Sequence, residues 1–323
     1  MRGRLLPLAC LLLAARASAL NGSLACLTCD SGGPHGACVA ASLQLTARDL
    51  ATGHSSVLAR FPNASLDTLD LLATAVSPAA DALFISLVAA DGVSGVLVRF
   101  SLSQRAVVSV VPAPACAFLS VADVPDPASV ACLTDAPYYG VDGRSYVLRI
   151  HAASGAAEEL AAWPGSPVPV DVVAVVDAAA GVLYAVLADE AAGAEYVLGW
   201  SLATGKLAAK VEVPATTEWL DAVFDPRAGV LGVVNDLSAK PAATIFGALD
   251  LARGTWKTVS KALGAFDTVY GLAAAAPAAG AVFVSALDKA KVVSLVGLRV
   301  DDGAIVYNKP ADGLCTSLAY LPL

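Results

Sequence analysis

The chain has 323 residues, of which 57% are hydrophobic, 6% aromatic and 15% charged. This apolar content excludes an intrinsically disordered chain, and the length supports a core too large for a small disulfide scaffold. The formal net charge is -8, so the chain lacks the excess of basic residues that is typical of a nucleic-acid-binding domain, and no nucleic-acid partner is expected.

Residues 1–19 have the features of a secretory signal peptide. Two early arginines precede an apolar run over residues 5–15, and small residues at 17–19 fit a cleavage site. The alternative is a short membrane anchor, but the run is short for a bilayer core of about 30 Å. The sequence therefore predicts a secreted or secretory-lumen protein in which residues 20–323 form one domain.

Two sequons agree with secretion, because Asn21-Gly-Ser and Asn63-Ala-Ser are acceptor triplets for N-glycosylation. No membrane span is expected in the remainder of the chain. The uncharged stretch Thr268–Leu287 is mostly alanine and glycine with Pro277 near its centre, which indicates two strands and a turn.

A short turn that ends in glycine recurs along the chain. An apolar run precedes it and another follows, as in Ser201-Leu-Ala-Thr-Gly205. Its copies recur at intervals of about 50 residues or twice that, a spacing typical of repeated structural units. The turn glycines are Gly53, Gly155, Gly205, Gly254 and Gly303. The turn Ser101-Leu-Ser-Gln-Arg105 fills the remaining position without a glycine.

A second turn recurs out of phase with the first. Its clearest copies are Asp177-Ala-Ala-Ala-Gly181, Asp225-Pro-Arg-Ala-Gly229 and Ala276-Pro-Ala-Ala-Gly280. Both turns are typical of β-hairpins, in which glycine permits positive φ, and the flanking runs are rich in β-branched residues. Alanine favours helix, but proline and glycine recur too often for long helices.

Each unit therefore contains four strands in about 50 residues, which is the size of a β-propeller blade. The innermost strands are expected to start near Leu69, Phe118, Val170, Leu220, Phe266 and Thr316. The last start leaves room for one strand, so residues 24–61 must supply the other three strands of that blade. We predict an all-β propeller of six four-stranded blades, closed by pairing of the N- and C-terminal strands. A seven-bladed ring and a pair of β-sandwiches are the alternatives.

The repeats resemble those of quinoprotein-like and YVTN-like propellers. The resemblance lies in Gly181-Val-Leu-Tyr184 followed by Tyr196-Val-Leu-Gly-Trp-Ser-Leu-Ala-Thr-Gly-Lys206, and it extends from about residue 43 to the end of the chain. It implies the propeller fold, and no catalytic residue or cofactor is carried over from it.

Six cysteines follow the leader, an even number that suggests disulfides in a secreted chain. Cys116 and Cys132 flank one hairpin and are expected to pair. Cys315 lies on the closing strand and is expected to pair with a cysteine of the N-terminal segment 20–42, where the candidates are Cys26, Cys29 and Cys38.

Histidines are too dispersed for a metal site or a catalytic triad. His54 and His151 lie in outer turns of different repeats, and His35 lies in the N-terminal segment. Both chemistries need imidazoles that converge on one point, so we predict no metal site and name no catalytic residue or cofactor.

Acidic residues recur where the innermost strands begin, at Asp70, Asp171, Asp221 and Asp267. These starts surround one mouth of the central channel, where a ring of carboxylates attracts a cation or a cationic ligand. In the alternative interpretation each aspartate accepts hydrogen bonds from the backbone of a neighbouring blade, which would also explain its recurrence. Trp219 precedes Asp221 on the same side and is a candidate ligand platform.

The sequence favours a secreted scaffold that binds a protein or a small-molecule ligand, neither of which it identifies. The alternative is an enzyme at the channel mouth, either a quinoprotein-like oxidoreductase or a lactonase-like metal hydrolase. Lactonase-like propellers with six blades use glutamate and asparagine ligands. Asn235, directly after a predicted strand, is the best-placed asparagine.

Overall fold

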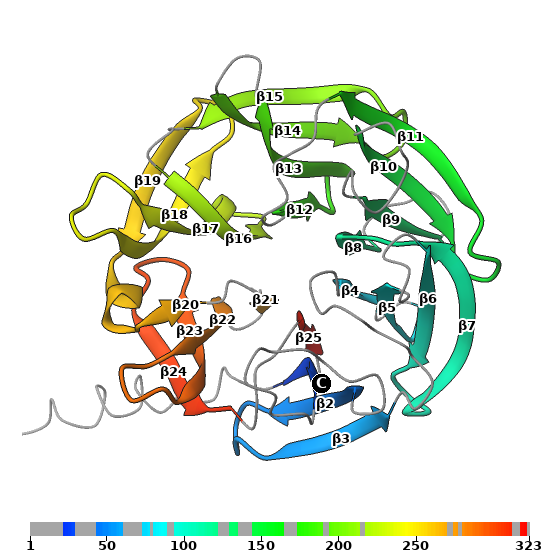
Figure 1. Cartoon of the computed structure of the whole chain (residues 1–323), viewed down its shortest axis with the longest axis horizontal. Coiled ribbons are helices and arrows are strands. Elements are labelled where there is room, and N and C mark those ends of the chain that lie inside the picture. Colours follow the sequence, from blue (N-terminus) through cyan, green and yellow to red (C-terminus); the bar gives the residue numbers. More distant parts are fainter. Residues whose placement is uncertain are drawn as a thin grey trace, which may run out of the picture.

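The computed structural model describes residues 22–29, 43–60, 73–77, 80–88, 94–121, 129–134, 144–164, 173–189, 194–213, 217–269, 274–276, 280–311 and 317–321. Within these residues, six antiparallel sheets stand side by side in a ring around a central axis (Figure 1). The protein is a six-bladed β-propeller, as the repeats predict.

The strands of each blade are given from the innermost to the outermost. Blade 1 contains β25 (Ser317–Leu321), β1 (Ser23–Cys29), β2 (Leu43–Asp49) and β3 (Ser55–Arg60). Blade 2 contains β4 (Ala73–Ser77), β5 (Ala82–Val88), β6 (Ser94–Ser101) and β7 (Ala106–Pro114). Blade 3 contains β8 (Phe118–Ser120), β9 (Ser129–Leu133), β10 (Arg144–His151) and β11 (Ala157–Pro164).

Blade 4 contains β12 (Ala174–Asp177), β13 (Val182–Asp189), β14 (Ala194–Ser201) and β15 (Leu207–Val213). Blade 5 contains β16 (Thr217–Asp225), β17 (Gly229–Asp236), β18 (Ala243–Asp250) and β19 (Thr255–Ser260). In blade 6 the innermost position is divided between β20 (Thr268–Val269) and β21 (Ala274–Ala276). Its other strands are β22 (Ala281–Leu287), β23 (Val293–Arg299) and β24 (Ile305–Pro310).

The ring closes within blade 1, where the last strand of the chain pairs with the first. β25 is antiparallel to β1, with Ser23 opposite Leu321 and Cys26 opposite Leu318. The predicted closure by strands from both ends of the chain is therefore confirmed, and it gives blade 1 its fourth strand.

The recurring glycines hold adjacent blades together. Gly205 has φ +67°, and a Cβ added there would collide with the carbonyl oxygen of Leu160, on the outermost strand of the preceding blade. Gly155 has φ +72° and meets the carbonyl of Pro112 on β7 in the same way. The glycine thus serves two purposes, because it permits the left-handed turn and lets that turn pack directly on a neighbouring backbone.

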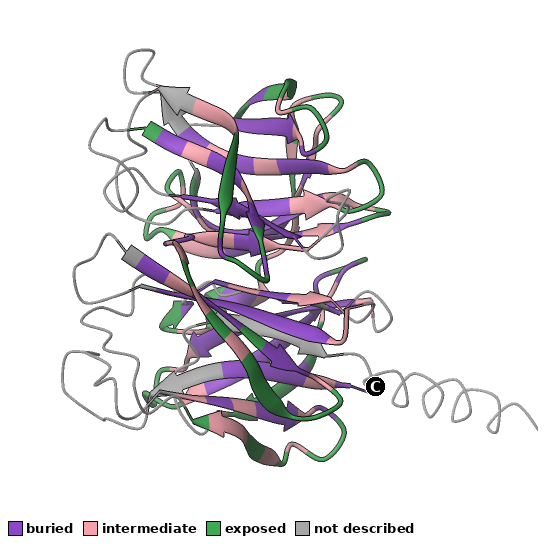
Figure 2. Ribbon diagram, turned by 90° about the vertical axis from the view of Figure 1, so that its right-hand side faces the viewer, coloured by how far each residue is buried: buried purple, intermediate pink, exposed green. Residues whose placement is uncertain are grey.

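The core lies between the blades, in apolar layers buried on both sides (Figure 2). One layer joins blades 2 and 3 through residues such as Phe84, Leu97 and Leu148. Glycines within strands make room for aromatic rings, since a Cβ at Gly232 would overlap the indole of Trp219. The chain's abundant small residues therefore allow the sheets to approach closely.

Candidate functional site

We call the end of the ring at which the innermost strands begin the mouth face. Because successive strands of a blade are antiparallel, the second strand of each blade ends there and the third begins there. Of the predicted mouth residues, Asp221 and Asp267 belong to the described residues, whereas Asp70 and Asp171 lie outside them.

The two described aspartates are both engaged by groups of this chain. Asp221 lies on β16 at a β-bulge, and its Oδ1 accepts a hydrogen bond from the N–H of Ala222 at 2.6 Å. Asp267 precedes β20 and forms an ion pair with Lys291, in the turn between β22 and β23. Both carboxylates thus contact groups of this chain. Neither of these two contacts is the bond to a neighbouring blade's backbone that the alternative interpretation expected, because Asp221 accepts from the residue next to it and Asp267 pairs with a side chain.

The structure also places a polar chain on the mouth face of blade 5. The amide nitrogen of Asn235 donates to Glu218 Oε2 at 2.8 Å, and the hydroxyl of Thr244 donates to Asn235 Oδ1 at 2.9 Å. Sequence reasoning singled out Asn235 but missed Glu218. The hydrogen bonds join the first three strands of the blade, so only the register of those strands brings these residues together.

Glu195, near the start of β14, lies on the same face in the preceding blade, blade 4. Partial burial raises the pKa of its carboxyl, and the negative charge of Glu218 raises it further. The ionised form is therefore destabilised in the folded protein.

Replacing Glu195 with glutamine should raise the melting temperature at neutral pH. Because the pKa is raised, ionisation of Glu195 weakens the native state as the pH rises. Below the ordinary glutamate pKa of 4.5, Glu195 is neutral, as the glutamine is at every pH. The difference between Glu195→Gln and the unmodified protein should therefore shrink as the pH falls toward about 4.5 and be absent below that pH. Thermal scans across this range would measure it, and a difference that grows on acidification would contradict the assignment.

The innermost strands themselves are lined by small apolar residues. Ala75, Ala174, Val175 and Ala222 are all buried. In the part of the chain that the structure describes, no three histidine, cysteine, aspartate or glutamate side chains group as metal ligands. His54 and His151 lie in outer turns of blades 1 and 3, and His35 lies outside the described residues.

Trp219 packs in the apolar layer between blades 4 and 5 and does not form an open ligand platform. Its buried ring meets Trp256 of β19 edge to face, with 5.1 Å between the ring centroids. The space for the two indoles comes from Gly232 and Gly247 on the intervening strands.

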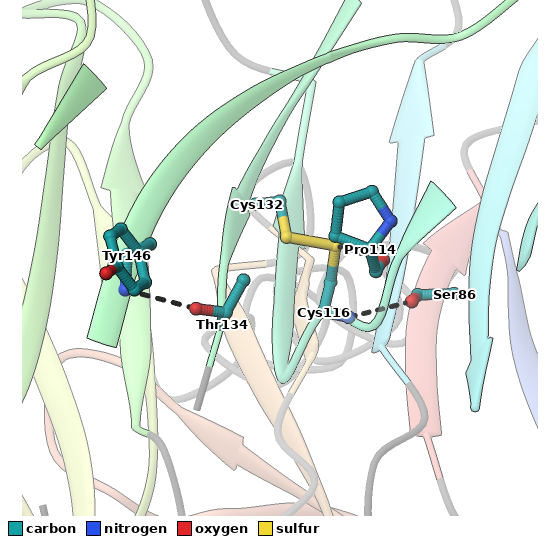
Figure 3. The surroundings of a disulfide bond; sticks show 6 residues. All are labelled: Ser86, Pro114, Cys116, Cys132, Thr134 and Tyr146. Atoms are coloured by element: carbon teal, nitrogen blue, oxygen red, sulfur yellow. Dashed lines mark hydrogen bonds between the residues drawn. A yellow bond between two sulfur atoms is a disulfide. The ribbon is translucent and has the colours of Figure 1, made fainter. Parts of the chain in front are cut away.

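A disulfide joins Cys116 to Cys132, as predicted (Figure 3). Cys116 follows β7, and its N–H donates to the hydroxyl of Ser86 in blade 2 at 3.1 Å, whereas Cys132 lies on β9 of blade 3. The bond thus links the segment that connects blade 2 to blade 3 covalently to β9. Such bonds are typical of oxidising compartments.

Cys26 is also disulfide-bonded. The side chains of the other three predicted partners, Cys29, Cys38 and Cys315, lie outside the described part of the structure, as do residues 1–19 and both sequon asparagines, Asn21 and Asn63. The pairing of Cys315 therefore stays a prediction. Among the described residues, no helix is both long enough and apolar enough to cross a membrane.

No protein-family model and no curated protein matches the chain. Solved structures do resemble it. TolB from Acinetobacter baumannii aligns with a TM-score of 0.63 at 12% identity, over 94% of this chain and 67% of that one. A chain of the nidogen–laminin complex aligns with a TM-score of 0.59 at 10% identity, over 93% and 98% of the two chains.

A putative 6-phosphogluconolactonase from Bacteroides fragilis aligns with a TM-score of 0.53 at 11% identity, over 94% of this chain and 98% of that one. At such identities the likeness establishes the fold alone. These similarities confirm the propeller fold, and the functions of the similar proteins differ from one another.

Proposed function

We propose that the protein is a secreted scaffold that binds a protein or small-molecule ligand on the surface of its ring. The observation that carries this proposal is the engagement of the mouth aspartates. Asp267 is paired with Lys291 and Asp221 accepts from its own bulge, so these carboxylates contribute to the ring itself. The similar propeller from the nidogen–laminin complex supports the idea that such a ring can serve in protein association.

Cross-linking of the protein secreted by cultured cells would test this function. We expect reproducible cross-links to a partner protein, and a mature N-terminus at Leu20 if the leader is removed as predicted. Protein retained inside the cells with residues 1–19 attached would contradict secretion. A secreted protein that cross-links to no other protein and binds no small molecule of the medium would contradict the scaffold function.

A metal-dependent hydrolase at the mouth face is the second candidate. The hydrogen-bonded Glu218 and Asn235 favour it, because carboxylate and amide oxygens suit a hard cation such as Ca²⁺. Calorimetric titration with Ca²⁺ and elemental analysis of the purified protein would test it. Glu218→Gln should abolish cation binding, whereas Glu159→Gln, on the exposed outer strand β11, should leave it unchanged. Protein that binds no cation would exclude this candidate.

A further inference from the structure

The outermost strand of blade 2 differs from the other five in charge. β7 has the sequence Ala-Val-Val-Ser-Val-Val-Pro-Ala-Pro and contains no charged residue. Every other outermost strand carries at least one, and these are Arg60 on β3, Glu158 and Glu159 on β11, Lys210 and Glu212 on β15, Lys257 on β19 and Lys309 on β24. Charged side chains on an edge strand discourage pairing with other chains, and β7 lacks this protection.

β7 also exposes apolar side chains. Val107, Val108 and Val110 are 38%, 44% and 57% exposed. The strand forms the edge of its sheet, so one side of its backbone has no strand beside it. The turn of the next blade reaches β7 at Val111 and Pro112, which leaves residues 106–110 as the open part of this edge.

The turn before β7 contains an unusual arginine. Arg105 has φ +51° at the position where the equivalent turns of the other five blades have glycine. Two other non-glycine residues among those described have positive φ, and both are compensated. Asp81 accepts hydrogen bonds from the N–H of Ser103 at 2.8 Å and from the hydroxyl of Ser101 at 2.7 Å, and Lys291 is paired with Asp267.

The side chain of Arg105 has no such partner among the described residues. It is exposed and forms no ion pair with any described residue, and the nearby carboxylate of Asp81 is already taken by the serines of the same turn. Hydrogen bonds from Ser101 and Ser103 to Asp81 hold the turn in this conformation, and the Arg105 side chain extends from it without an ion pair to any described residue. The free guanidinium, at the beginning of an uncharged apolar edge, is complementary to a carboxylate.

We propose that β7 is a strand-addition site for an extended apolar segment of another protein, with an acidic residue toward the C-terminal end of that segment. This inference rests on the proposed scaffold function and assigns its surface. In an antiparallel arrangement the backbone of the segment pairs with the open edge of β7, and its apolar side chains cover Val108 and Val110. The C-terminal end of the segment then lies beside Arg105, where its carboxylate meets the guanidinium.

A displayed library of random peptides, selected on the purified full chain, would test this site. The probes are the selected peptides, synthesised with a fluorescent label, each with a counterpart whose acidic residue is replaced by the matching amide. We expect peptides rich in β-branched residues with an acidic residue near the C-terminal end. Val110→Lys should weaken their binding by about tenfold or more, because it places a charge on the pairing edge. Val57→Lys, at a position on β3 that is 47% exposed against 57% for Val110, should leave binding unchanged.

Arg105→Gly separates binding from stability. It should weaken the acidic peptide several-fold and leave the amide counterpart nearly unaffected, while the melting temperature of the protein stays the same or rises, because glycine relieves the positive φ. Equal losses for both peptides would refute the pairing of Arg105 with a carboxylate.

Other outcomes would overturn the site and leave the scaffold function standing. Selected peptides whose affinity is unchanged by Val110→Lys would bind elsewhere on the ring. A dimer in sedimentation that Val110→Lys dissociates means that a second copy of the chain occupies β7. A selection that yields no peptide refutes the site, whereas the scaffold function depends on the cross-linking of the secreted protein.

Discussion

Replacing Gly205 with alanine should lower the free energy of unfolding by about 3 kcal/mol. Holding a non-glycine residue in the left-handed conformation costs about 1 kcal/mol, and forcing a methyl group into a packed contact costs about 2 kcal/mol more. Here the obstacle is the carbonyl of Leu160, a backbone group of the preceding blade that can move only if β11 moves with it. Urea unfolding followed by circular dichroism would measure the loss.

Gly254 provides the matched control. It has φ +66°, nearly the same as Gly205, but a Cβ there would meet only the side chain of Val211, at 3.3 Å. Gly254→Ala should therefore lose about 1 kcal/mol, mainly through its backbone conformation. Equal losses at the two positions would mean that the close contact between Gly205 and Leu160 adds nothing to the loss of stability, and that only the turn conformation requires glycine.

Replacing both Cys116 and Cys132 with alanine should lower the free energy of unfolding by a similar amount. The two residues are 16 positions apart, and closing a loop of that size stabilises a native state by about 3 kcal/mol, mainly because the unfolded chain loses conformational freedom. Both cysteines are also buried in the layer between blades 2 and 3. The alanine side chains that replace them stay buried, so they gain no solvation that would offset the lost stability.

Two measurements check this expectation. Peptide mapping without reductant should recover the segments around Cys116 and Cys132 as one linked species. Urea unfolding of the double variant should then show the lower stability. Free thiols at both positions in the purified protein, or a variant as stable as the parent, would contradict a stabilising bond between these blades.

The ring was predictable because its signals repeat and are local. Turn glycines such as Gly205 and Gly181 recur in phase with apolar runs, so their spacing reveals four strands per unit and six units. The closing strand followed from counting, since only a few residues remain after Thr316. A disulfide across one hairpin was equally predictable, because Cys116 and Cys132 are close in sequence and therefore in space.

The surface chemistry was harder to predict because it depends on register between strands. Glu218 and Asn235 are 17 positions apart and meet only because their strands pair one particular way. The mouth aspartates looked like a binding ring, yet Lys291 reaches Asp267 from a turn that the repeat pattern leaves undefined. Trp219 looked available for a ligand, and only the glycines across blade 5 show that it fills a space there.

The closure of blade 1 has a consequence for how the protein is made. β1 is synthesised before the other described strands of the ring, but the strand that covers its inner edge, β25, consists of residues 317–321 and is synthesised after them. During synthesis the nascent chain therefore holds an open sheet edge, of the kind that invites pairing with other unfinished chains. A chain that lacks β25 would leave the inner edge of β1 unpaired.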